Sequence, residues 1–108
     1  MKLYFYTLNT DERYRKTGIT AQVCEAEEKP KTYAPINDSI FPNYISRLRK
    51  VDIGHFISYN SNVVAFTEPS FEHAKEMFKD REKARIEKAK MELDKLENEL
   101  KVIEESEE

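Results

Sequence analysis

The hydrophobic and polar positions along the chain change period, and this predicts strands first and one long helix last. Residues 2–8 alternate between two faces, and residues 19–26 do so again. A period of two residues is typical of a β-strand. The predicted faces are Leu3, Phe5 and Thr7 against Tyr4 and Tyr6 in the first segment, with Ile19, Ala21 and Val23 sharing a face in the second. We expect the two segments to form a hairpin.

The middle of the chain predicts a loop and a short strand. Residues 27–43 contain three prolines, and because proline cannot donate to a sheet ladder we expect a long ordered loop there. Residues 44–51 are expected to form a short strand that carries Arg47 and Arg49 on one side.

A second hairpin is expected where two apolar runs flank Asn60 and Ser61. The runs are residues 54–59 and 62–67, and Asn-Ser is a short polar turn between them. Pairing Tyr59 with Asn62 gives both faces of this hairpin a largely apolar character. One face would be covered by the start of the following helix, and the other would need a second layer.

The last third of the chain is a continuous helical pattern from about Ser70 to about Ile103, with no Gly or Pro after Pro69. Such a helix would be about 50 Å long, whereas the preceding 69 residues, packed compactly, would be about 28 Å across. About half of the helix should therefore leave its own domain. An apolar seam with 3-4-3-4-3 spacing follows that distal half: Ile86, Ala89, Leu93, Leu96, Leu100 and Ile103. A seam that its own chain does not cover predicts a homodimer or higher oligomer.

These elements predict an α+β fold with two parts. Residues 1–69 would form a small antiparallel β-sheet domain. Residues 70–108 would form one long C-terminal amphipathic helix, ending in an acidic tail, that mediates oligomerisation.

Charge changes this picture along the helix. Residues 70–90 carry seven basic against five acidic side chains, and residues 91–108 carry two against eight. That order opposes the helix macrodipole, so we expect the acidic end to fray.

Cys24 is the only cysteine, which excludes an intrachain disulfide and a cysteine-based zinc site. With no signal peptide or membrane span in the pattern, we expect a cytoplasmic protein without a metal or cofactor.

Catalytic signatures are missing from the sequence. Its two histidines and two glycines form no phosphate-loop or metal-ligand pattern. A Cys24–His–acid site would need a convergence in space that the sequence does not indicate. We therefore expect a protein that binds without turnover.

A nucleotide site is the sharper possibility. The apolar helix stripe is interrupted between Phe78 and Ile86, where Arg81 and Arg85 lie four residues apart on one face. Two guanidinium groups beside an aromatic ring suit a nucleotide phosphate and base. Further walls of this pocket are expected from Arg47, Arg49 and Tyr59. The plainer alternative is that these arginines form ion pairs along the helix or cover apolar surface with their stems.

The order of features also resembles a known group of proteins. The chain has a Tyr-rich first strand, the segments KTYAPIND and SRLRK, a DIG turn, the run FISYNSNVVAFTEP and a long helix beginning SFEHAKEMF. In these it resembles small accessory proteins of phages and prophages, and its layout is similar to the Thoeris anti-defence sponges. The resemblance implies an oligomer that sequesters a cyclic ADP-ribose-type immune signal in the infected host cell.

Two other functions remain open at this point. An anti-CRISPR-type inhibitor of a host defence protein has the same size and acidity, and would act by protein contact. A phage assembly or structural protein is the third possibility. Direct binding of duplex DNA is not expected, because the net charge is −3 and basic residues are interleaved with acidic ones.

Overall fold

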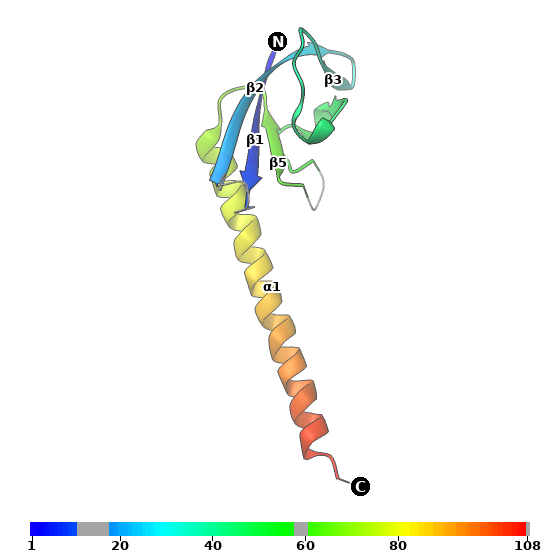
Figure 1. Cartoon of the computed structure of the whole chain (residues 1–108), viewed down its shortest axis with the longest axis vertical. Coiled ribbons are helices and arrows are strands. Elements are labelled where there is room, and N and C mark those ends of the chain that lie inside the picture. The colour runs from blue at the N-terminus through cyan, green and yellow to red at the C-terminus, as the bar shows by residue number, and fades with distance from the viewer. Residues whose placement is uncertain (11–17, 58–60, 108) are drawn as a thin grey trace. The chain divides into compact units, whose positions relative to one another are not determined.

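The computed structural model describes residues 1–10, 18–57 and 61–107, in two compact units, Met1–Lys75 and Glu76–Glu108. The first unit contains a five-stranded antiparallel sheet, and helix α1 (Phe71–Glu105) begins there and continues through the second unit (Figure 1). This confirms the α+β class and the long C-terminal helix. Within the described ranges, no helix is both long and apolar enough to cross a membrane.

The sheet has the order β4-β3-β2-β1-β5, so β1 lies between β2 and β5 (Figure 1). Two short 3₁₀ segments, η2 and η3, flank β4 along the chain. The bounds are β1 Lys2–Asn9, β2 Gly18–Glu28, β3 Thr32–Pro35, η2 Pro42–Tyr44, β4 Leu48–Arg49, η3 Lys50–Asp52 and β5 Val63–Phe66.

The first predicted hairpin is confirmed. Strands β1 and β2 pair in an antiparallel ladder in which Leu3 lies opposite Cys24 and Tyr4 lies opposite Val23. The buried side of β2 is formed by Cys24 and Ala26. The face that Val23 shares with Ile19 and Ala21 is the opposite one, and Val23 itself is exposed.

The second predicted hairpin is confirmed only in part, because its second run forms β5 whereas the described part of its first run, residues 54–57, is not a strand. Strand β5 pairs with β1, with Tyr6 opposite Val64. Residues 54–57 also lie against β5, through an isolated antiparallel bridge between Phe56 and Val64 and a bond from the Ile57 N–H to the Val63 carbonyl at 3.5 Å. Gly54, whose φ of 77° lies in the left-handed region, turns the chain there and donates its N–H to the Ala65 carbonyl at 2.9 Å. The bridge is also one residue out of the expected register. Tyr59, the expected turn neighbour, lies outside the described residues.

The proline-containing loop is shorter than expected, because β2 extends to Glu28 and pairs with β3. Pro35 is tolerated in β3 for a geometric reason. Two bonds mark hydrogen-bonded pairs of this ladder, one from the Lys29 N–H to the Thr32 carbonyl and one from the Ile36 N–H to the Glu25 carbonyl. In an antiparallel ladder, hydrogen-bonded and non-hydrogen-bonded pairs alternate. Pro35 therefore occupies a non-hydrogen-bonded pair toward β2. On its other side, β4 pairs only with Thr32 and Tyr33.

The main core lies on one face of the sheet and is closed by apolar residues from the loops. Its largest members with almost no exposure are Phe5, Phe41, Leu3 and Leu48. The rings of Phe5 and Phe41 lie 4.9 Å apart between centroids. The core comprises Leu3, Phe5, Cys24, Ala26, Tyr33, Phe41, Leu48, Val63 and Ala65, with Ile45, Ile53 and Ile57 packed against it.

The opposite face of the sheet receives the first turn of α1. The Ser70 backbone N–H donates to the Tyr6 hydroxyl at 2.8 Å, and the Ser70 carbonyl accepts the Ala74 N–H. Tyr6 also contacts the rings of Phe66 and Phe71 edge-on. The helix start is thus fixed to β1 by one hydrogen bond and an aromatic cluster.

Candidate functional site

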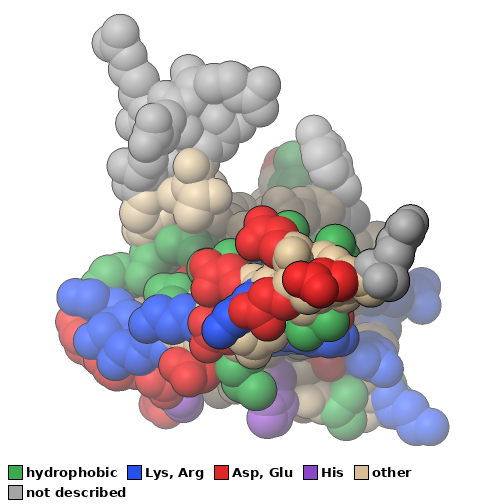
Figure 2. Space-filling view, turned by 90° about the horizontal axis from the view of Figure 1, so that it is seen from below, with side chains coloured by type: hydrophobic (Ala, Val, Ile, Leu, Met, Phe, Trp, Pro, Cys, Tyr) green, Lys and Arg blue, Asp and Glu red, His purple; other side chains and the backbone are tan. Residues whose placement is uncertain are grey.

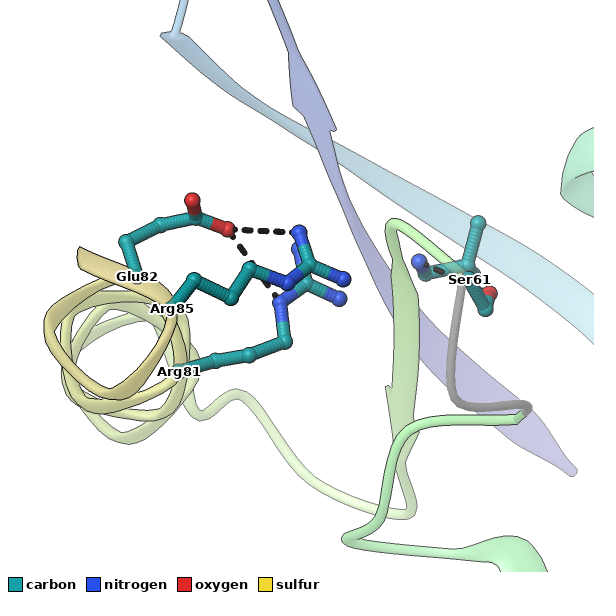
Figure 3. Close-up of polar contacts among 5 residues, drawn as sticks. Ser61, Arg81, Glu82 and Arg85 are labelled. Atoms are coloured by element: carbon teal, nitrogen blue, oxygen red, sulfur yellow. Dashed lines mark hydrogen bonds and ion pairs between the residues drawn. The ribbon is translucent and has the colours of Figure 1, made fainter. Parts of the chain in front are cut away.

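A cluster of charge on the helix is formed by Arg81, Glu82 and Arg85. Arg81 Nε donates to Glu82 Oε1 at 3.3 Å, and Arg85 Nη1 donates to the same oxygen at 3.0 Å (Figure 3). The four-residue spacing places the two arginines on one side of α1. The structure therefore brings the two guanidinium groups together, as their spacing predicted, with one carboxylate between them.

Arg81 is largely buried and lies close to a second positive charge, that of Arg85. Its side chain is 11% exposed, and its pKa lies below the ordinary arginine value, first because burial removes water from the guanidinium and second because Arg85 carries a like charge nearby. Glu82 opposes this lowering through its own charge and hydrogen bond. Of the three side chains in this cluster, two are positively charged and one is negatively charged.

Phe78 supports this cluster in a different way from the expected one. Its side chain is 3% exposed, and the Arg81 guanidinium carbon lies 5.4 Å from the centre of its ring. This is the distance of a cation–π contact. A ring so buried does not present a face to a nucleotide base, so the contact with Arg81 is the role that the structure supports for Phe78.

Arg47 and Arg49 belong to the other unit, and only Arg49 lies in the strand that was expected to carry both, because β4 is limited to Leu48 and Arg49. Arg49, at the end of β4, forms a two-pronged ion pair with Asp52, with Nε to Oδ2 at 3.0 Å and Nη2 to Oδ1 at 3.2 Å. The hydrogen bond to Asp52 raises the Arg49 pKa. Arg47 is exposed. Because Arg47 and Arg49 lie in Met1–Lys75 and Arg81 and Arg85 lie in Glu76–Glu108, their joining in one pocket stays a prediction, as does the part assigned to Tyr59.

Cys24 shows how burial changes a reactive group. Its side chain is almost inaccessible, and this burial raises the thiol pKa, against a smaller lowering by the hydrogen bond from Gln22. The thiol is the less nucleophilic form. In the described ranges, no group of three or more His, Cys, Asp or Glu side chains is arranged to hold a metal ion.

The apolar seam on the distal helix is exposed along its whole length. Each of its five large members is between 52% and 71% exposed, and Ala89 is exposed as well. In the space-filling view, hydrophobic side chains reach the surface beside Asp and Glu side chains (Figure 2). The chain itself thus leaves the seam Ile86, Ala89, Leu93, Leu96, Leu100 and Ile103 in contact with solvent.

Two partners were missed by reasoning from the sequence. The alternative that the arginines form ion pairs along the helix is borne out by these contacts, but the sequence did not single out Glu82 as the partner that Arg81 and Arg85 share. The Arg49–Asp52 pair follows from a three-residue spacing across β4 and η3, which the pattern alone did not define. No family model, no curated protein and no solved structure matches the chain.

Proposed function

We propose that this protein binds, without turnover, an anionic ligand that carries phosphate, and that Arg81 and Arg85 hold the phosphate. The observation that carries this proposal is the convergence of two guanidinium groups on a single carboxylate oxygen. The resemblance to phage anti-defence proteins makes a cyclic nucleotide immune signal the first ligand to test.

Phosphate suits this cluster better than a neutral ligand does. Guanidinium groups are planar forks that match phosphate oxygens two at a time. Arg81 and Arg85 carry like charges close to the same carboxylate oxygen, so they repel each other, and a dianion beside them would reduce that repulsion. Because Arg81 is largely removed from water, the attraction would be screened less than at an open surface.

Glu82 gives the proposal a specific consequence. Its Oε1 occupies the position between the two guanidinium groups, so an incoming phosphate has to share the arginines with this carboxylate. Glu82→Gln removes the negative charge and keeps the shape of the side chain. We expect this variant to bind a phosphate ligand more tightly than the natural protein.

The test is a thermal melting series with linear and cyclic nucleotides, followed by calorimetric titration of any that stabilises. A ligand at a hundred times its dissociation constant adds about 2.7 kcal/mol to stability. Arg85→Ala should weaken binding by about 1.5–3 kcal/mol, the scale of a hydrogen bond to a charged group. Arg85→Lys should recover only part of the loss.

Lys88→Ala is the matched control, because Lys88 is an exposed cation one turn further along the helix. Equal loss in Lys88→Ala and Arg85→Ala would show that general positive charge, not the arginine pair, attracts the ligand. If no nucleotide stabilises the protein and a host defence protein forms a stoichiometric complex with it, the inhibitor reading replaces this one. A protein that retains neither ligand nor host protein would favour the assembly role.

A further inference from the structure

The seam of the distal helix can be given a partner and a direction. Its residues recur every three and four positions, which is the spacing of the a and d positions of a coiled-coil heptad. Ile86, Leu93 and Leu100 take the a positions, and Ala89, Leu96 and Ile103 take the d positions. All six are exposed in the single chain. The residues beside the seam then decide which arrangement of two copies is stable.

These flanking residues carry charges in a definite order. In heptad terms the e and g positions lie on the two edges of the seam, where they face the partner helix. The e positions are Lys83, Lys90, Glu97 and Glu104, and the g positions are Arg85, Glu92, Glu99 and Ser106.

A parallel pair of this helix would place like charges together at every flanking contact. In a parallel pair each g residue faces the e residue five positions later in the partner. The contacts would be Arg85 with Lys90, Glu92 with Glu97, and Glu99 with Glu104. Each contact occurs twice by symmetry, and each is repulsive.

An antiparallel pair reverses most of these signs. The register that superposes the whole seam places Ile86 opposite the partner's Ile103 and Leu93 opposite the partner's Leu96. The e positions then face each other, which brings Lys90 to the partner's Glu97 and Lys83 to the partner's Glu104. Both contacts are attractive and occur twice.

Two further details favour the antiparallel register. Only Glu92, facing the partner's Glu99, remains beside a like charge, while Arg85 faces the partner's neutral Ser106. Ala89 lies opposite the partner's Leu100, so a small residue meets a large one, as good packing requires. The same register lays the basic first half of one helix along the acidic second half of the other.

We propose that residues 83–106 form an antiparallel helical pair with a second copy of this chain, with the two-fold axis between Leu93 and Leu96. The two helices then start at opposite ends of the pair. At 1.5 Å per residue, the first residues of α1 lie about 70 Å apart along the pair axis, whereas a parallel pair would hold them at the helix spacing of about 10 Å.

A charge reversal separates the two directions by the sign of its effect. Lys90→Glu places two negative charges at the contact with the partner's Glu97, so the dimer dissociation constant measured by analytical ultracentrifugation should rise about tenfold, or about 1.4 kcal/mol. Glu97→Lys should weaken the dimer by a similar factor. The combined variant Lys90→Glu, Glu97→Lys should restore dimerisation.

The control is Lys95→Glu, which changes net charge equally but lies outside the seam and its edges. Its dimer should dissociate like the natural one. A parallel pair predicts the reverse for Lys90→Glu, which would tighten the dimer by removing the repulsion from the partner's Arg85. Tightening in that variant, or a natural protein that stays monomeric at tens of micromolar, overturns the proposal.

A disulfide test reads the register directly. A variant with both Ile86→Cys and Ile103→Cys should oxidise to a dimer whose peptide map links position 86 to position 103. Ile103→Cys alone should not cross-link, because the two copies of residue 103 lie about 25 Å apart along the axis. The natural protein serves as the control for the buried Cys24. A 103–103 linkage overturns the antiparallel register.

Discussion

Tyr6 joins two elements through the two ends of its side chain. Its ring contacts Phe66 and Phe71 at centroid distances of 6.0 and 6.1 Å, and its hydroxyl accepts the Ser70 N–H where α1 begins. The first N–H groups of a helix have no partner within the helix. The Tyr6 hydroxyl is the acceptor for one of these N–H groups, although Tyr6 lies in a strand more than half the chain away along the sequence. Neither the strand pattern nor the helix pattern indicates this contact.

We predict that Tyr6→Phe destabilises the first unit by about 1–3 kcal/mol. The ring contacts would remain, but the part-buried Ser70 N–H would lose its acceptor, and an unsatisfied polar group carries that penalty. Urea unfolding measures the change. Tyr4→Phe, on the same face of β1, is the control and should stay within about 0.5 kcal/mol. Equal effects in the two variants would contradict the role of the hydroxyl.

At the same scale, part of the charged cluster followed from the sequence. Helical spacing was enough to place Arg81 and Arg85 together, because a continuous helix fixes neighbours four residues apart. The burial of Phe78 and the bridging role of Glu82 were not predictable, because they depend on side-chain conformation. The interrupted apolar stripe indicated the position of the charged cluster, and the contacts with Glu82 show how the two arginines are held.

Among the described strands, β4 is the shortest, and of its two residues only Leu48 is buried. Leu48 is 1% exposed, while Val51, three residues later, is 72% exposed. Only Thr32 and Tyr33 pair with β4 across the ladder. So few backbone bonds cannot fix a strand, so the burial of Leu48 in the core has to do so.

We therefore predict that Leu48→Ala lowers stability by about 2–5 kcal/mol, the range for removing a buried leucine side chain. Val51→Ala, which also shortens an aliphatic side chain but at an exposed position, should change stability by no more than about 0.5 kcal/mol. Chemical denaturation of both variants makes the comparison. A loss below 1 kcal/mol in Leu48→Ala would show that β4 is held by something other than this contact.

Elements were predictable from the sequence where their partners are close along the chain. The β1–β2 hairpin is local, so alternation and a short connection were sufficient to identify it. Strand β5 was recognised as an apolar strand, yet its partner β1 was not, because alternation carries no information about which distant strand lies alongside. Pro35 led to the wrong expectation of a loop at this position. A residue in a non-hydrogen-bonded pair of an antiparallel ladder needs no N–H, so proline can occupy it.

At the scale of the whole molecule, the exposed seam predicts that association and helix stability depend on each other. Leu93→Asp combined with Leu96→Asp would bury charge at the centre of the helical pair. We expect this variant to be monomeric by light scattering and to lose helical circular dichroism from the distal part of α1, because an isolated helix of this length is marginal in water.

The matched variant is Met91→Asp combined with Asn98→Asp, which adds the same charge to the same helix outside the seam. It should keep the mass and helicity of the natural protein. The seam would be ruled out as the interface if both variants became monomeric together, or if the first kept its natural mass.

The position of β1 between β2 and β5 also has a consequence for the order in which the sheet assembles. Its contact with β2 closes through a short connection, whereas its contact with β5 joins Thr7 to Val63 across most of the first unit. Closing a long loop costs more chain entropy than closing a short one, and distant pairings slow folding. During synthesis, one edge of β1 therefore has no pairing strand until residues 63–66, which form β5, have been made. Throughout that interval, the row of N–H and C=O groups on this edge is open to pairing with another chain.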